Sequence, residues 1–214
     1  MANFSVNLAG QVALVTNAGE GIGRAAALAL ARAGAAVCAN SINPDRAASV
    51  VAEIEAGGGR AMAWTADVSD RFQVAAMIET LRDRFEGLHI LINSAGVERR
   101  EALLRIDEYD WRRVLEINLT GTFFCTQLAG RVMADEGGGV IVNVASTAGY
   151  ALPRPDGAAF AASQAGIIGL TREAARDLAG RGVRVNAVCP ANITATREQA
   201  DPTRIPQGRT GTPE

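Results

Sequence analysis

The sequence predicts an α/β fold in which a doubly wound parallel sheet is covered by helices on both faces. Short, β-rich apolar runs alternate along the chain with longer stretches that are rich in alanine and leucine. The short runs are largely apolar, as expected of strands that are buried on both faces. No internal repeat or low-complexity linker divides the 214 residues, so we expect a single domain over residues 1–214.

Six apolar runs have the length and composition of strands. They are Val12–Val15, Ala36–Ala39, Ala61–Thr65, His89–Ile92, Val140–Val144 and Arg184–Val188. The stretches between them predict helices over Ile22–Ala33, Asp45–Ala56, Arg71–Phe85, Tyr109–Ala134 and Gly157–Ala179. Ligands of such sheets bind at the carboxyl ends of the strands, near the switch in strand order. The residues that directly follow each strand are therefore the candidate site.

The composition excludes several kinds of chemistry. All 21 basic residues are arginine, and the absence of lysine excludes a Schiff base or the lysine of a phosphate loop. The arginines are dispersed and form no basic stripe, which argues against a nucleic-acid partner. No run of about 18 apolar residues is free of charge, and the N-terminus lacks the pattern of a secretory signal. We therefore expect a cytoplasmic protein with no membrane partner.

The cysteines and the histidine are expected in structural roles. Cys38, Cys125 and Cys189 are odd in number, far apart and set in apolar runs. This pattern is typical of small core residues in a reducing compartment, so we expect neither a disulfide nor a metal site. The single histidine, His89, begins an apolar run, which favours a structural role over membership of a catalytic triad.

A glycine-rich segment follows the first predicted strand and leads directly into a helix. It reads Thr16-Asn-Ala-Gly-Glu-Gly-Ile-Gly-Arg24. Glycines let the backbone turn and approach a pyrophosphate, and free N–H groups at a helix start favour negative charge. Arg24 stands where the third glycine of a G-x-G-x-x-G motif would be. On its own, this segment is equally compatible with a plain strand-to-helix turn.

Six further motifs make the chain similar to the short-chain dehydrogenase/reductase family, and in particular to its 3-oxoacyl-ACP-reductase-like members. They are Ala66-Asp-Val68, Asn93-Ser-Ala-Gly96, Asn118-Leu-Thr-Gly-Thr-Phe123, Asn143-Val-Ala-Ser146, Phe160-Ala-Ala-Ser-Gln-Ala-Gly166 and Arg184-Val-Asn-Ala-Val-Cys-Pro190. The resemblance extends from about Leu8 to Glu214 in the family's order and spacing, and it implies a Rossmann-like fold. Family members normally continue with a further helix and strand, so we expect these to be missing and residues 191–214 to form a flexible lid or tail.

The resemblance implies a nicotinamide dinucleotide as cofactor. The glycine loop would line the phosphates and the adenosine ribose, Asp67 and Val68 the adenine, and Pro190 and Ile193 the nicotinamide. The full set that the resemblance assigns to the cofactor is Asn17, Gly19, Glu20, Gly21, Ile22, Gly23, Ser41, Asp67, Val68, Asn93, Ala95, Gly96, Gln164, Pro190 and Ile193. Asn17 replaces the family's first glycine, and asparagine tolerates positive φ better than most residues.

The choice between NAD and NADP stays open, with a preference for NAD. Ser41 occupies the position after the second strand where an acidic residue would bind the ribose hydroxyls of NAD. Glu20 occupies the glycine-loop position where a basic residue would favour NADP, and its charge would repel the extra phosphate. The nearest cation, Arg46, is expected to be a surface charge of its helix.

Two of the family's four catalytic positions are kept. Asn118 matches the asparagine and lies within an apolar stripe of its predicted helix that includes Phe123. A polar amide on an apolar face needs a partner, so bracing of the helix is an alternative role. Ser146 matches the serine that would polarise a substrate carbonyl, and a loop serine that caps a backbone group is its alternative.

The other two positions, the tyrosine and the lysine, are replaced by Phe160 and Gln164, four residues apart on one helix face. In the family, the tyrosine gives or takes a proton and the lysine cation lowers its pKa. Phenylalanine has no ionisable proton, and glutamine has no charge. General acid–base catalysis contributes ~10²–10⁴-fold, so ordinary ketone reduction should be slower by at least that factor. Gln164 is still able to hydrogen-bond the nicotinamide ribose.

Three hypotheses follow for the activity. The first is a dinucleotide-binding protein without ordinary redox catalysis. The second is an active oxidoreductase of a small carbonyl or alcohol substrate, with Tyr150 or a water held by Ser146 and Asn118 as substitute acid. The third is a non-redox lyase or cyclase. Because the last two predicted helices resemble those that pair family subunits, we expect a homodimer before a homotetramer.

Overall fold

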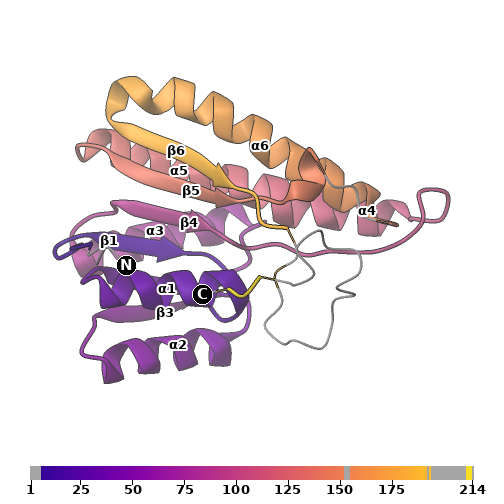
Figure 1. The fold of residues 1–214 in the computed structure, drawn as a ribbon. Coiled ribbons are helices and arrows are strands. Elements are labelled where there is room, and N and C mark those ends of the chain that lie inside the picture. The colour runs from indigo at the N-terminus through magenta and orange to yellow at the C-terminus, as the bar shows by residue number, and fades with distance from the viewer. Residues whose placement is uncertain (1–5, 152–154, 192, 194–210, 214) are drawn as a thin grey trace.

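The computed structural model describes residues 6–151, 155–191, 193 and 211–213. In this part of the chain, six parallel strands form one sheet in the order β3-β2-β1-β4-β5-β6 (Figure 1). The strands are β1 (Val12–Val15), β2 (Ala36–Ser41), β3 (Ala61–Thr65), β4 (Ile90–Asn93), β5 (Gly139–Val144) and β6 (Val183–Val188). The order reverses between β1 and β4, as in a Rossmann-like sheet. The predicted doubly wound α/β fold is therefore confirmed.

Helices connect the strands, and three of them begin at a residue whose side chain caps the first turn. They are α1 (Gly21–Arg32), α2 (Pro44–Ala56), α3 (Arg71–Phe85), α4 (Glu108–Leu115), α5 (Gly121–Asp135) and α6 (Ala158–Leu178), with the shorter turns η1 (Glu116–Thr120), η2 (Thr147–Gly149) and η3 (Ala179–Arg181). The side chains of Asn43, Asp70 and Asp107 accept hydrogen bonds from first-turn N–H groups of α2, α3 and α4.

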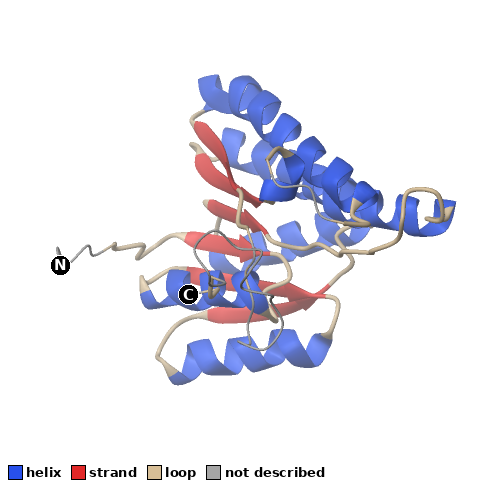
Figure 2. Cartoon of the chain, turned by 45° about the vertical axis from the view of Figure 1, so that its right-hand side comes forward, coloured by secondary structure: helices blue, strands red, loops and turns tan. Residues whose placement is uncertain are grey.

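The two faces of the sheet are covered by different helices (Figure 2). Alternate residues of β1 point to opposite faces, so that Leu14 packs in the core beneath α3 and α5, whereas Val15 packs in the core beneath α1 and α2. Both side chains are completely buried. This double coverage explains why β1, at the centre of the sheet, is apolar throughout.

The helix predicted over Tyr109–Ala134 is found as one continuous helical segment, Glu108–Asp135, but it contains a π-helical turn that was not predicted. A π-helical turn, η1, separates α4 from α5 and contains the fully buried Asn118. The Thr122 hydroxyl donates to the Asn118 carbonyl oxygen at 2.6 Å within this turn. The inward stripe also ends sooner than expected, because the side chain of Phe123 is exposed. A π turn inserts one residue into the helix and so rotates the faces on either side of it.

The structural roles of the histidine and of two cysteines are confirmed. His89 Nδ1 accepts a hydrogen bond of 3.1 Å from the backbone N–H of Val12. Cys38 and Cys125 are fully buried, and burial raises the pKa of both thiols to about 12. Cys189 is partly buried.

Most of the expected tail, residues 191–214, lies outside the described residues. Within it, Ile193 forms an isolated parallel bridge with Gly211. None of the helices within the described ranges is long and apolar enough to cross a membrane.

Candidate functional site

The loop after β1 is joined to the loop after β4 at the switch in strand order. The buried Thr16 donates its backbone N–H to Ile92 O at 3.0 Å. Its hydroxyl oxygen accepts from the N–H groups of Ser94 and Ala95 at 2.9 and 3.0 Å. The two segments that the resemblance assigns to the cofactor therefore share one hydrogen-bonded corner. Sequence reasoning missed Thr16, although its position directly after a strand marks it.

The glycine loop has a backbone shape that few side chains permit. Asn17 has a φ of +48° and Gly21 a φ of +54°, both in the left-handed region. A Cβ on Gly23 would lie 2.3 Å from Asn17 O, so only glycine lets α1 pack this closely against the loop. In a G-x-G-x-x-G motif, the third glycine lets the helix pack closely against the loop. Here Gly23, one residue before that position, allows this close packing.

Gly19 allows a second close approach, between the glycine loop and the first turn of α2. A Cβ on Gly19 would lie 2.6 Å from Arg46 Cβ and 3.3 Å from Ser41 Oγ. Arg46 also forms an ion pair with Glu20. The expectation that Arg46 is a mere surface charge of its helix is therefore wrong, because two loops distant in sequence meet at this residue.

A cavity of about 160 Å³ lies beside the loop, above the carboxyl ends of β1 to β4. It is lined by Asn17, Glu20, Asn40, Ile42, Ala66, Asp67, Val68, Ala95, Gly96, Val97, Arg113 and Ile117. Six of the predicted cofactor residues are among them. The apolar side chains and the single partly buried carboxylate, Asp67, suit a flat heterocycle with a hydrogen-bonding edge.

Asp67 is held in place by several hydrogen bonds. Its Oδ1 accepts from the N–H and hydroxyl of Ser69 at 2.9 and 2.6 Å, and its Oδ2 accepts from Arg113 at 2.9 Å. Burial opposes ionisation of this carboxyl, but the hydrogen bonds from Ser69 and Arg113 outweigh burial and lower its pKa. Asp67 is therefore a fixed anion at neutral pH. No sequence pattern pointed to Arg113, whose partner lies 46 residues away.

A second cavity of about 240 Å³ adjoins the first, and the two share Asn17 and Glu20. It is lined by Asn17, Glu20, Gly21, Ile22, Ser94, Val144, Ile193 and Pro213. The two cavities together extend from the end of β3 across the glycine loop to the end of β5. This path follows the strand ends, where an extended ligand of a doubly wound sheet lies.

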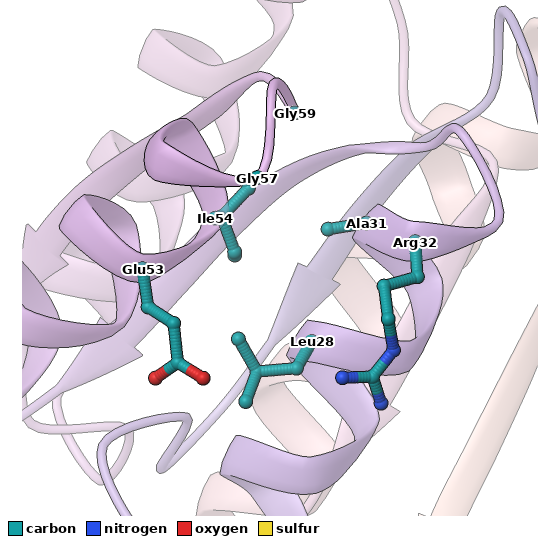
Figure 3. Close-up of a pocket in the computed structure, with 7 residues that line it drawn as sticks. All are labelled: Leu28, Ala31, Arg32, Glu53, Ile54, Gly57 and Gly59. Carbon is teal, nitrogen blue, oxygen red and sulfur yellow. The ribbon is translucent and has the colours of Figure 1, made fainter.

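A third cavity lies between α1 and α2 and is separate from these two (Figure 3). Its volume is about 190 Å³, and the side chains of Leu28, Ala31 and Ile54 point into it, with Arg32 and Glu53 at its sides. None of its lining residues was predicted to belong to the site. It is formed by the carboxyl-terminal halves of the two helices, away from the carboxyl ends of the strands.

The retained asparagine acts as a brace. Asn118 Oδ1 accepts from Val97 N at 2.8 Å, and Asn118 Nδ2 donates to Val97 O at 2.9 Å and to Ser163 Oγ at 3.0 Å. The side chain therefore ties the segment after β4 to α6. This is a bracing role of the kind expected as its alternative, and it does not exclude participation in chemistry.

The replaced pair lies on α6 beside this brace. Gln164 is 4% exposed, and its Nε2 donates to Ser163 Oγ at 3.4 Å. Ser163 Oγ in turn donates to the carbonyl oxygen of Phe160 at 2.7 Å, and the Phe160 side chain is partly buried. Ser163 thus receives two amide donors, from Asn118 and Gln164. No pattern in the sequence distinguishes this serine from others.

Ser146 lies at the end of β5 and caps the short turn η2. Its hydroxyl oxygen accepts from Ala148 N at 3.2 Å and lies 3.5 Å from Pro190 O. Thr147 N donates to the same carbonyl oxygen at 3.0 Å, which holds Pro190 beside η2. Tyr150 ends this turn with its side chain 68% exposed.

Asn93 and Ser41 are not among the residues that line either cavity. Asn93 Nδ2 donates to Thr126 Oγ1 at 3.1 Å and to Asn143 Oδ1 at 2.8 Å, in a buried network that continues to Thr171. Asn93 Oδ1 is buried and has no partner among the described residues. Ser41 is buried, and its hydroxyl oxygen accepts from Asn43 N. Direct contact of either side chain with a cofactor stays a prediction.

Comparison with known proteins identifies relatives over nearly the whole chain. The profile described as short chain dehydrogenase matches residues 11–204. The chain is 43% identical to a 3-oxoacyl-[acyl-carrier-protein] reductase of Synechocystis, covering 97% of this chain and 86% of that one. It is 38% identical to the corresponding reductase of Thermotoga maritima, over 98% and 88%.

Comparison with solved structures identifies relatives of the same family. A short-chain type dehydrogenase/reductase from Mycobacterium marinum superposes with a TM-score of 0.92 at 35% sequence identity. The match covers 97% of this chain and 85% of that one.

Proposed function

This chain belongs to the short-chain dehydrogenase family of oxidoreductases, and from that premise we propose that it binds a nicotinamide dinucleotide but is silent or strongly impaired in ordinary hydride transfer between an alcohol and a ketone. The observation that carries this proposal is the pair Phe160 and Gln164 on α6. Neither side chain is able to hold or move a proton where the family uses tyrosine and lysine.

The residues present fit a dinucleotide. The glycine loop has positive φ values at Asn17 and Gly21 and leads into the N-terminus of α1, where free backbone N–H groups favour an anion. Asp67 presents a fixed carboxylate to the first cavity, where the adenine would lie. Ile193 and Pro213 border the second cavity, on the side where the nicotinamide would lie. The cofactor would supply the hydride, and the protein would supply shape and charge.

Of the described residues at the family's acid positions, neither Phe160 nor Gln164 is able to act as a general acid for a carbonyl bound by the retained serine. Ser146 is placed to donate a hydrogen bond to a substrate carbonyl, because the hydroxyl lies at the strand end and its only close acceptor is Pro190 O at 3.5 Å among the described residues. A hydrogen bond polarises a carbonyl but does not deliver the proton that an alkoxide product needs. General acid–base catalysis contributes ~10²–10⁴-fold, and we expect a loss of that size.

Titration with NADH and with NADPH, together with an assay of a simple alcohol–ketone pair, tests the proposal. We expect saturable binding of at least one dinucleotide without turnover at normal enzymic rates. Turnover at such rates that disappears in the Asn118→Ala/Ser146→Ala double variant would contradict it. Absence of all binding would contradict the dinucleotide part.

A substitute acid at Tyr150 is the alternative with an observation in its favour. Tyr150 lies four residues after Ser146, at the end of the turn that Ser146 caps. Its exposed side chain is able to exchange protons with water. If this alternative holds, Tyr150→Phe abolishes whatever turnover the protein has, whereas unchanged turnover removes it.

The substrate class and assembly are also proposals. We propose a small carbonyl or alcohol ligand beside Ser146, and a homodimer formed through α5 and α6 in the cytoplasm. In support of the dimer, α6 exposes Ala162, Ala165 and Gly169 along one face, and α5 exposes Phe123. Small side chains permit close helix packing. A stable monomer in solution scattering would contradict the dimer.

A further inference from the structure

The reacting end of the site holds uncharged side chains where the family uses a proton donor and a cation. Phe160 and Gln164 lie one turn apart on α6. Ser146 caps the turn η2. This turn packs directly against α6, because a Cβ on Gly149 would lie 2.7 Å from the backbone carbonyl carbon of Gln164. A ligand held by Ser146 is therefore close to the part of α6 that carries the two substitutions.

The amide of Gln164 does not repel a positively charged ligand. The side chain is 4% exposed, and its Nε2 donates to Ser163 Oγ at 3.4 Å. A lysine at this position would place an ammonium ion beside the ligand, and like charges repel. An amide carries a dipole but no charge. The chain contains no lysine, so no lysine ammonium stands here or anywhere else in the protein.

Two neighbouring features favour a positive charge at this end. Phe160 keeps an aromatic ring at the position of the family's tyrosine, and aromatic faces attract cations. Asp156 lies directly before Gly157, the N-cap of α6, and its side chain is exposed. Its carbonyl oxygen accepts from Glu101 N at 2.9 Å, which brings a second acidic residue to the same corner. The two substituted positions thus offer an aromatic ring and an uncharged amide, with carboxylates nearby.

A ketone and an iminium ion differ in whether their reduction needs a proton. A ketone that accepts a hydride becomes an alkoxide, which needs a proton that neither Phe160 nor Gln164 is able to give. An iminium carbon accepts the same hydride, the π electron pair of the C=N bond passes to nitrogen, and a neutral amine results. No proton enters this step, and the charge of the ligand is lost. A site without a proton donor is therefore suited to an iminium ion.

We propose that this site reduces an iminium ion, a cationic C=N compound, with a dihydronicotinamide as the hydride donor. A C–H bond of the dihydronicotinamide breaks with its electron pair, and a C–H bond forms at the iminium carbon. The products are an amine and the oxidised dinucleotide. This inference rests on the proposed dinucleotide binding, and it names the cationic nitrogen analogue of a carbonyl as the substrate class. Reduction of an ordinary ketone stays impaired.

N-methyl-3,4-dihydroisoquinolinium and 1-tetralone test the activity, because they share a bicyclic frame and differ in charge at the reacting group. With NADH deuterated at C4, we expect protein-dependent transfer of deuterium to the iminium carbon and ketone turnover at least a hundredfold slower. If a sample binds NADH or NADPH but adds nothing to the protein-free rate of iminium reduction, the inference fails and the proposed function stands. If neither dinucleotide binds, the proposed function fails as well.

Binding of an unreactive cation gives a readout that does not depend on turnover. N,N-dimethyl-1,2,3,4-tetrahydroisoquinolinium keeps the positive charge but has no C=N bond to reduce. In the presence of NADH, we expect its dissociation constant to be about tenfold lower than that of 1-tetralone. Phe160→Leu should weaken binding of the cation about threefold, because the aromatic ring is lost. Equal affinities for the cation and the ketone would overturn the inference.

Gln164→Lys should change the two substrates differently. We expect iminium reduction and binding of the cation to fall about tenfold through repulsion, while ketone turnover does not fall. Gln11→Lys is the matched control, since Gln11 directly precedes β1 at the amino end of the sheet, away from the site. It should leave both substrates unaffected. An equal loss of iminium reduction in the two variants would show a general charge effect and overturn the inference. If the buried lysine unfolds the protein, as circular dichroism would show, Phe160→Leu decides, and unchanged binding of the cation then overturns the inference.

Discussion

The dinucleotide end and the reacting end of the candidate site differ in what they have kept. At the dinucleotide end, Thr16 joins the loops after β1 and β4, and Gly23 permits the close packing of α1. At the reacting end, Ser146 still follows β5, but Phe160 and Gln164 occupy the positions of the proton donor and its activator. On the proposed function, the first end would still bind the dinucleotide, whereas the second would lack its proton donor.

The difference follows from how each end is built. Binding at the first end depends on backbone shape, which the loop glycines and Thr16 determine together. Chemistry at the second end depends on two side chains that project from a helix of ordinary shape. A substitution on α6 therefore changes the reaction without disturbing the loop. Binding and catalysis are separable in this fold because different elements carry them.

Restoring the reacting end should produce the largest effect. In Phe160→Tyr/Gln164→Lys, a phenol and a cation return to one helix face beside Ser146. We expect turnover of a simple ketone with bound dinucleotide to rise ~10²–10⁴-fold, measured by nicotinamide absorbance. Each single variant should gain far less, because the acid and its activator act together. Unchanged turnover in a double variant that still binds the dinucleotide would contradict the separation of the two ends.

Breaking the dinucleotide end should produce the next largest effect. In Gly23→Ala, the new Cβ would lie 2.3 Å from Asn17 O, so the loop must move. We expect dinucleotide affinity to fall about a hundredfold, because the N–H groups of the loop lose their alignment. Gly180→Ala is the control, since nothing lies within 4 Å of its Cβ position. Equal affinities in the two variants would exclude this role for the loop.

Asn118 connects the two ends, so its removal should affect stability. Asn118→Ala leaves the N–H and carbonyl of Val97 and the hydroxyl of Ser163 without their buried partner. We expect the free energy of unfolding to fall by about 2–3 kcal/mol in urea denaturation. Ser163→Ala leaves both hydrogen bonds between Asn118 and Val97 in place and should cost less, about 1 kcal/mol. A smaller loss in Asn118→Ala than in Ser163→Ala would refute the bracing role.

The strands of the sheet could be predicted from the sequence, because a buried strand has a locally apolar composition. Runs such as Val12–Val15 are apolar on both faces, and glycines mark the turn that follows. The bounds of α3 also matched, since Asp70 caps its first turn. The positive φ of Asn17, which its residue type permits, is likewise found in the structure.

Long-range partners could not be predicted in the same way. The pairing of Arg46 with Glu20, and of Arg113 with Asp67, depends on loops that meet only after the sheet has formed. The π turn at Asn118 leaves no pattern in a helix that is apolar on one side before and after it. Asn93 was assigned to the cofactor from its motif, yet its side chain belongs to a buried network with Asn143.

The smallest expected effect concerns Arg113, which tests whether the dinucleotide end depends on charge as well as shape. Burial raises the pKa of Asp67, but the hydrogen bonds from Ser69 and Arg113 outweigh burial and together lower this pKa below its unfolded value near 3.9. A carboxyl with a depressed pKa stabilises the fold fully above its unfolded pKa, and this stabilisation is lost as pH falls through the folded pKa. In Arg113→Gln, the free energy of unfolding at pH 7 should therefore be about 0.5 kcal/mol lower. The effect is small because the pair is partly exposed.

The stability difference between the protein and Arg113→Gln should begin to close as the pH falls below about 4, and it should vanish only below the lowered folded pKa of Asp67, where this carboxyl is protonated in both proteins. Urea denaturation across this range measures it. NADH affinity at pH 7 should fall about threefold in Arg113→Gln, because Asp67 loses the partner that orients it. Arg82→Gln is the control, since Arg82 pairs with Glu136 away from the cavity and its loss should leave NADH affinity unchanged. If both variants bind NADH like the unaltered protein, the adenosine end depends on the shape of the loop and not on the orientation of this carboxylate.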